Sequence, residues 1–124
     1  MTNKNIFFLI IGLLILGTII TIISRPAESN ISSTKYDTFA KCLALKNLTM
    51  YCTVWCSHCK AEKARFGDSF KYVPYVECTE NPNLCLEKGV ESYPTWLDEN
   101  GGKYIGEQGL EKLSQISSCE LPID

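Results

Sequence analysis

Two cysteines spaced C-x-x-C, Cys56 and Cys59, lie between a short apolar segment and a charged segment with helical spacing. The preceding residues 48–54 (LTMYCTV) are rich in strand formers, and about 11 residues from the cysteine pair onward predict a helix. The first thiol would then lie at a helix start, where unpaired N–H groups and the helix dipole favour an anion. Because a thiolate is the nucleophile in disulfide exchange, this arrangement predicts a reactive dithiol.

The spacing also predicts a role for each residue of the pair. Cys56 would attack or be attacked, and Cys59, one helical turn further, would resolve the mixed disulfide. His58 lies between them, and histidine titrates near neutrality, so it is a candidate for stabilising the Cys56 thiolate. A more stable thiolate makes the reduced form more stable, which favours a donor of disulfides. No cofactor is needed for this chemistry.

Two other uses of the pair compete with exchange. A C-x-x-C ring is short and strained, which makes it a poor structural staple. A copper or zinc carrier is the alternative function, in which Cys56, His58 and Cys59 would supply at most three ligands. A second pair, Cys78 and Cys85, could complete such a site, although C-x6-C is an unusual spacing for zinc.

An uncharged apolar run from residue 6 to residue 23 sets the N-terminal part of the chain apart. As a helix it would extend roughly 27 Å, close to the thickness of a bilayer's hydrocarbon core. The run is longer than the apolar part of a signal peptide and no A-x-A site follows, so we expect an uncleaved transmembrane anchor. Residues 1–5 would be a short tail, 24–35 a flexible linker, and 36–124 one folded domain.

The folded part predicts alternating helices and strands. We expect helices over 36–47, from the cysteine pair onward, over 81–90 and over 109–119, strands over 48–54 and 71–78, and a hairpin over 94–107. A helical crossover implies that the first two strands are parallel, whereas the hairpin must be antiparallel. The prediction is a mixed four-stranded sheet with helices on both faces. In the helix after the cysteines, Ala61, Ala64 and Arg65 fall at helical spacing, with Phe66 beside them, while Lys60, Glu62 and Lys63 should face water or rim the site.

A second motif, SYPTW at residues 92–96, makes the pattern more specific. WCSHCK at a strand-to-helix turn, followed by YPT, resembles the thioredoxin fold. The stretch from 36 to about 118 is most similar to the thioredoxin-like domain that accompanies bacterial vitamin K epoxide reductase homologues. The resemblance implies that Pro94 is cis and packs against the active-site sulfurs, and that Tyr93 offers backbone hydrogen bonds to an extended substrate. Trp55, beside the nucleophile, is expected to be exposed and to contact substrate.

The resemblance also implies partners. These are protein thiols or disulfides, and a vitamin K epoxide reductase-like, quinone-linked membrane oxidoreductase that re-oxidises the pair. The chain departs from classical thioredoxins because residues 48–54 contain no carboxylate that could deprotonate the second cysteine, which argues against efficient reductase chemistry. A net charge of −2 gives no reason to expect a nucleic-acid partner.

The chain has seven cysteines, so at least one is unpaired within a monomer. Cys78 and Cys85 can close a disulfide, as in the domain that the chain resembles, and it could serve as a staple or as a second redox pair. Cys42 and Cys119 could pair or remain buried thiols. Cys52 replaces an expected small residue and should share a face with Met50, and we expect it to be the unpaired one. Such cysteine density suits an oxidising compartment, which favours a single-pass membrane protein with an extracytoplasmic soluble domain.

Overall fold

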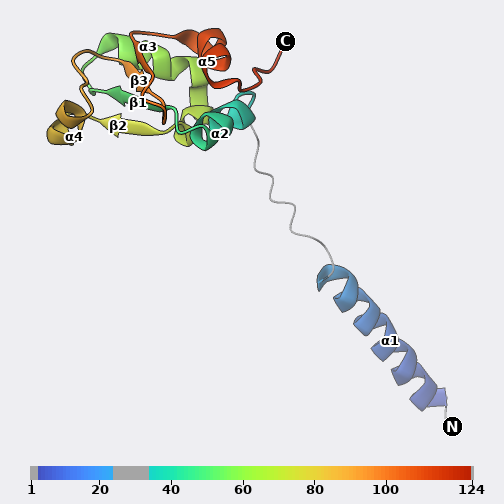
Figure 1. The fold of residues 1–124 in the computed structure, drawn as a ribbon. Coiled ribbons are helices and arrows are strands. Elements are labelled where there is room, and N and C mark those ends of the chain that lie inside the picture. The colour runs from blue at the N-terminus through green and yellow to red at the C-terminus, as the bar shows by residue number, and fades with distance from the viewer. Residues whose placement is uncertain (1–2, 24–33, 124) are drawn as a thin grey trace. The chain divides into compact units, whose positions relative to one another are not determined.

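The computed structural model describes residues 3–23 and 34–123, and the chain divides near residue 33 into two units. The first unit contains one helix, α1 (Asn3–Ile23). The second contains a sheet and its surrounding helices (Figure 1). The predicted linker over 24–35 lies outside the described residues except for Thr34 and Lys35, and so do the first two residues of the predicted tail.

Helix α1 covers the predicted apolar run. Among the helices of the described residues, none meets the combined length and apolarity needed to cross a membrane. The expected anchor over residues 6–23 is therefore not confirmed and stays a prediction.

The second unit contains the predicted alternation of helices and strands. Its elements are α2 (Asp37–Leu45), β1 (Thr49–Cys52), α3 (Ser57–Phe66), the 3-10 helix η1 (Gly67–Tyr72), β2 (Tyr75–Glu77), α4 (Pro82–Glu87), β3 (Thr95–Leu97), β4 (Lys103–Ile105) and α5 (Gly109–Ser117). The strands are in the order β2-β1-β3-β4. β1 pairs parallel with β2 and antiparallel with β3, and β3 pairs antiparallel with β4. The predicted mixed four-stranded sheet is confirmed.

The second strand is much shorter than the predicted 71–78. η1 occupies residues 67–72, and Pro74 immediately precedes β2. Proline has no N–H to donate to a ladder, so it marks the strand's beginning. Its carbonyl still takes part in pairing, since it accepts a hydrogen bond from the Met50 N–H at 2.9 Å.

The two faces of the sheet carry separate clusters of buried side chains. Alternation along β1 directs Met50 and Cys52 to one face, where the main core forms with α2, α3 and α5. Tyr51 lies on the other face and packs with Cys85 of α4. The members of the main core include Phe39, Leu43, Met50, Cys52, Cys56, Cys59, Phe66, Trp96 and Leu113. The cysteines at residues 52, 56 and 59 are thus part of the main core.

A long-range disulfide joins the two ends of this unit. Cys42 of α2 is bonded to Cys119, which follows α5, across 77 residues of sequence. The sequence left open whether these two cysteines pair. The structure pairs them because both α2 and α5 pack in the same core.

Helix α3 packs by a face that matches the expected one only at Phe66. Its buried residues are Cys59, Glu62 and Phe66, whereas Ala61, Ala64 and Arg65 are exposed. The expectation that Glu62 faces water is wrong. Glu62 is fully buried, and its carboxylate is satisfied there by hydrogen bonds from the Trp96 indole N–H at 3.2 Å and from the Gln108 N–H at 2.8 Å.

Candidate active site

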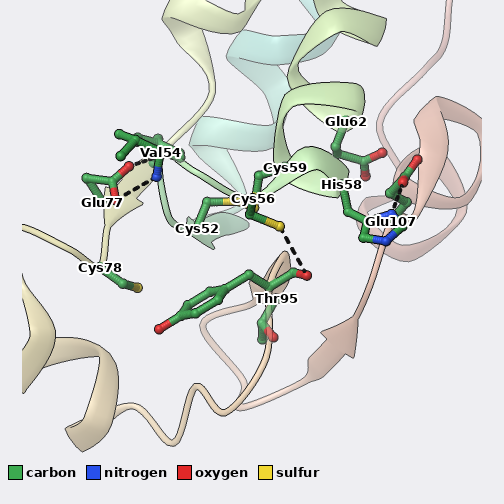
Figure 2. The surroundings of a disulfide bond; sticks show 12 residues. Cys52, Val54, Cys56, His58, Cys59, Glu62, Glu77, Cys78, Thr95 and Glu107 are labelled. Atoms are coloured by element: carbon green, nitrogen blue, oxygen red, sulfur yellow. Dashed lines mark hydrogen bonds and ion pairs between the residues drawn. A yellow bond between two sulfur atoms is a disulfide. The ribbon is translucent and has the colours of Figure 1, made fainter.

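The thiol of Cys56 lies at the N-terminus of α3. Cys56 is the N-cap residue, with φ −76° and ψ 120°, and its carbonyl accepts the first helical hydrogen bond, from the Lys60 N–H at 3.1 Å. Its side chain is 7% exposed, and its Sγ donates to the Tyr93 carbonyl at 3.6 Å (Figure 2). The first thiol therefore lies where the sequence predicted, at a helix end that favours an anion.

The second cysteine of the C-x-x-C pair has an unexpected disulfide partner. Cys59, in the first turn of α3, is disulfide-bonded to Cys52, and Cys56 is the free cysteine among the seven, all of which lie within residues 34–123. The expectation that Cys52 is unpaired is wrong. Cys52 ends β1 on the face that α3 covers, and its Cα lies 6.0 Å from that of Cys59, within the usual range for a disulfide.

The SYPTW segment lies against Cys56. The Tyr93–Pro94 peptide bond is cis, as the resemblance implies, and Pro94 is buried. Trp55 is 66% exposed, as expected, and its ring meets the Tyr93 ring edge to face at 6.0 Å between centroids. The Tyr93 carbonyl thus contacts the free thiol, and the exposed Trp55 ring packs against the ring of the same tyrosine.

His58 is exposed and interacts with a carboxylate. Its Nδ1 lies 2.7 Å from Glu107 Oε1 (Figure 2). Arg65 Nη2 donates to the other oxygen of Glu107 at 3.0 Å. The hydrogen bond from His58, followed by that from Arg65, lowers the pKa of Glu107. The predicted effect of His58 on the Cys56 thiolate is untested. Glu107 lies 49 residues from His58 in the sequence, so sequence reasoning missed it.

A second carboxylate supports the loop between β1 and α3. Glu77, the last residue of β2, accepts a hydrogen bond from the Val54 N–H at 3.1 Å (Figure 2). It also accepts one from the Thr79 hydroxyl at 2.6 Å and one from the Tyr75 hydroxyl. Burial raises the pKa of Glu77, but the hydrogen bonds from Thr79, Tyr75 and Val54 outweigh burial, so the net shift is downward. Residues 48–54 contain no carboxylate, and the neighbouring strand supplies this one.

Next to this carboxylate lies the second predicted cysteine pair. Cys78 follows β2 and is disulfide-bonded to Cys85 of α4, and both are buried. This pair packs with Tyr51 and Val90 on the face of the sheet opposite the main core. The structure thus keeps Cys78 and Cys85 in a cluster separate from Cys56 and Cys59.

Within residues 3–23 and 34–123, no group of three or more histidine, cysteine, aspartate or glutamate side chains is arranged to hold a metal ion. The cysteine ligands proposed for a carrier are instead in two separate disulfides, except for Cys56. The metal-carrier alternative gains no support from this arrangement.

Comparison with known proteins finds relatives that share one chemistry. No protein-family model matches the chain. The protein named thiol-disulfide oxidoreductase LTO1 from Arabidopsis thaliana is 33% identical over 106 residues, which cover 78% of this chain and 28% of that protein. Protein disulfide-isomerase from Aspergillus niger is 31% identical over 90 residues, covering 65% of this chain and 18% of the relative. Protein disulfide-isomerase from Aspergillus oryzae is 36% identical over 81 residues, covering 58% and 16%.

The chain spans less than a third of the length of these relatives. The comparisons do not distinguish a subgroup associated with vitamin K epoxide reductase homologues. The homologues are named as thiol-disulfide oxidoreductases, disulfide isomerases and a thioredoxin domain-containing protein, and they support placing the chain in the thioredoxin-like superfamily.

Proposed function

We propose that this protein is a thiol-disulfide oxidoreductase that exchanges disulfides with protein substrates through Cys56 and Cys59. The observation that carries the proposal is the free Cys56 thiol at the N-cap of α3, 3.6 Å from the carbonyl before the cis-proline. Homologues named as thiol-disulfide oxidoreductases and disulfide isomerases support a disulfide-exchange enzyme.

The proposed reaction begins at Cys56. In one direction its thiolate attacks a substrate disulfide and forms a mixed disulfide, which Cys59 resolves when it carries a free thiol. In the other direction a substrate thiolate attacks Cys56 in a Cys56–Cys59 disulfide, and a second substrate thiol releases the product disulfide. The exposed Trp55 would receive apolar parts of the substrate, and the Tyr93 backbone would bind its main chain.

Trapping of the mixed disulfide tests this function. A full-length Cys59→Ala variant lacks the resolving thiol and should accumulate a mixed disulfide with a reduced, unfolded protein after mild oxidation. A matched Cys56→Ala/Cys59→Ala variant should form none at this site. Exchange activity that survives in the Cys56→Ala single variant would overturn the function.

The expected direction of electron flow is toward the chain, so that it donates disulfides. The support is the helix N-terminus at Cys56, which favours the thiolate and hence the reduced dithiol. We expect a reduction potential above that of thioredoxin, which is about −270 mV. A potential at or below that value, measured by equilibration with glutathione buffers, would contradict the oxidant assignment.

We further propose that α1 anchors the protein in a membrane with the second unit on the extracytoplasmic side. The support is the apolar sequence of residues 6–23 and the exposure of apolar side chains such as Phe7, Phe8 and Leu13. The full-length chain should stay in the membrane fraction after alkaline extraction, and external protease should digest residues 34–123 in spheroplasts. Release into the soluble fraction would contradict anchoring.

A quinone-linked membrane oxidoreductase similar to vitamin K epoxide reductase is the proposed partner that re-oxidises the site. The support is the resemblance of residues 36–118 to the domain that accompanies bacterial homologues of that enzyme. When the two proteins are co-expressed, the Cys59→Ala variant should form a disulfide-linked complex with such an enzyme. Absence of the complex, with substrate trapping intact, would remove this partner alone.

A further inference from the structure

Three cysteines share one disulfide at the start of α3. Cys52 at the end of β1 is bonded to Cys59 in the first turn of α3, and Cys56 lies between them in sequence as a free thiol. All three side chains belong to the same buried cluster, and Figure 2 shows them together at the N-terminus of α3. Since C-x-x-C at a helix N-terminus is the spacing of an exchanging pair, Cys59 has two candidate partners.

The three cysteines differ in how accessible they are to a substrate. Cys52 is fully buried and Cys59 is 1% exposed, whereas Cys56 is 7% exposed and borders the exposed Trp55. Cys56 also contacts the carbonyl of Tyr93, on the segment where we propose that substrate binds. An incoming thiol would therefore meet Cys56 first, and the Cys52–Cys59 bond lies behind it.

We propose that Cys52 is a third reacting cysteine, which holds the site's disulfide in a protected pairing until Cys56 takes it over. This inference rests on the proposed function and adds a residue to its reaction. In the transfer, Cys56 loses its proton and its sulfur attacks Cys59 Sγ. The Cys56–Cys59 bond forms, the Cys52–Cys59 bond breaks, and Cys52 leaves as a thiolate that takes up a proton. The oxidation state of the site is unchanged, so no external oxidant or reductant takes part.

The two pairings have different reactivity toward a substrate. In the protected pairing, Cys56 is a thiol, so a substrate dithiol finds no disulfide at the entrance. In the Cys56–Cys59 pairing, substrate thiols reduce the disulfide and leave as a disulfide, while Cys56 and Cys59 become thiols. The oxidising rate is therefore proportional to the fraction of chains in the Cys56–Cys59 pairing.

Chymotryptic mapping distinguishes the two pairings because the aromatic residue Trp55 separates Cys52 from the other two cysteines. The oxidised full-length chain is alkylated at its free thiols, unfolded, cleaved after aromatic residues and examined by mass spectrometry without reduction. The protected pairing links the fragment of residues 52–55 to that of 56–66, with the alkyl group on Cys56. The other pairing leaves these fragments unlinked, with the alkyl group on Cys52.

The expected result is that linked fragments predominate in the wild-type chain. The Cys52→Ala variant should contain only the Cys56–Cys59 disulfide and should oxidise a reduced dithiol peptide faster than wild type. The increase should equal the inverse of the wild-type fraction of unlinked fragments, so that a fraction of one tenth gives about a tenfold faster initial rate. Leu48→Ala is the matched control, because it opens a buried space just before β1 and keeps every cysteine. It should change neither the pairing nor the rate beyond about twofold.

Three outcomes would overturn the proposal. In the first, fragments are never linked in the wild-type chain and Cys52→Ala leaves the rate unchanged, so Cys52 takes no part while the proposed function stands. In the second, fragments are linked but the Cys52→Ala rate does not rise, so the bond is a staple. In the third, wild type and Cys52→Ala both lack exchange with a peptide dithiol although Cys56 and Cys59 pair in the variant, and the proposed function fails as well. Circular dichroism of each variant shows whether a lost rate reflects unfolding.

Discussion

The strand-to-helix disulfides on the two faces of the sheet have nearly the same construction. Cys52–Cys59 and Cys78–Cys85 each span seven residues, with Cα separations of 6.0 Å and 5.8 Å. Each joins the end of a strand to the helix that follows it. The first has a free thiol, Cys56, in its own buried cluster, whereas the cluster around the second contains no other cysteine among the described residues. Under the proposed function, the neighbouring thiol, rather than the spacing of the bonded pair, is what distinguishes an exchanging disulfide from a structural one.

Removal of the Cys56 thiol should have the largest effect, and it should act on the rate of disulfide exchange. Cys56→Ala should reduce disulfide exchange to the background rate, because neither Cys52 nor Cys59 is accessible to a substrate. The rate of oxidation of a reduced dithiol peptide measures this loss. If the variant kept a substantial rate, the two strand-to-helix disulfides would not differ for the reason given.

The long-range disulfide provides the reference for a purely structural bond. Loss of Cys42–Cys119 in a Cys42→Ala/Cys119→Ala variant should lower the free energy of unfolding by about 4 to 5 kcal/mol, since it closes a loop of 77 residues. Denaturant unfolding followed by circular dichroism measures the change. A loss under about 1 kcal/mol would show that the unfolded chain gains little freedom when this bond is removed.

The disulfide on the opposite face should behave as a smaller staple. In a Cys78→Ala/Cys85→Ala variant we expect a loss of about 2 to 3 kcal/mol in the free energy of unfolding, because the loop is only seven residues long. Peptide oxidation at Cys56 should remain within about twofold of wild type under conditions where the variant is folded. A much larger loss of oxidation would instead support Cys78 and Cys85 as a second redox pair.

Glu77 lies between the two disulfide regions and should contribute less to the free energy of unfolding than the disulfides do. It is adjacent to Cys78 and accepts a hydrogen bond from the Val54 N–H in the loop before Cys56. Glu77→Gln should lower the free energy of unfolding at neutral pH by about 1 to 2 kcal/mol, because the amide nitrogen cannot accept the bonds that one carboxylate oxygen accepts.

The stabilisation by Glu77 should depend on pH in a direction set by the shift of its pKa. Because the folded-state pKa of Glu77 is lowered, its contribution is fully present above the ordinary value of 4.5 and is lost as pH falls through the lowered folded value. Unfolding free energies measured from pH 7 downward should converge for wild type and Glu77→Gln at acidic pH. A difference that stays constant with pH would mean that the charge of Glu77 has no part in it.

The smallest effect should come from the exposed rim of the active site. Glu107→Gln removes the charge that binds His58 and Arg65. Exposed ion pairs contribute little. At each pH between 5 and 8, the rate of Cys56 alkylation in this variant should therefore differ from that of wild type by less than about fivefold. A His58→Gln variant is the matched comparison, and a larger effect of Glu107→Gln than of His58→Gln would show that the carboxylate acts other than through the imidazole.

Much of the fold and part of the site could be read from local patterns. The mixed sheet, the parallel and antiparallel pairs and the thiol at the start of α3 follow from hydrophobic alternation, crossover length and the C-x-x-C spacing. The partner of Cys59 was missed, although a signal existed. Cys52 and Cys59 have the same spacing, strand end and helix turn as Cys78 and Cys85, for which a disulfide was recognised.

Other parts of the site carried no local signal. In the sequence, Glu62 is one of several charged residues in a predicted helix, which favours an exposed position. The tertiary fold instead places the Trp96 indole and the start of α5 around its carboxylate. Glu77 and Glu107 likewise reach the active-site loop and His58 from distant elements. Hydrogen-bond partners so far apart in sequence leave no periodicity by which they could be recognised.

The sequence by itself determined the order of the strands and α-helices of the second unit and where the first thiol lies, because these depend on neighbours within a few positions. Only the tertiary structure decided which sulfur Cys59 binds and which carboxylates support the loop. Disulfide pairing and burial depend on which segments the sheet and helices bring to within a few ångströms. Cys52 and Cys56 are both close to Cys59 in sequence, and packing at the end of β1 made Cys52 the bonded partner.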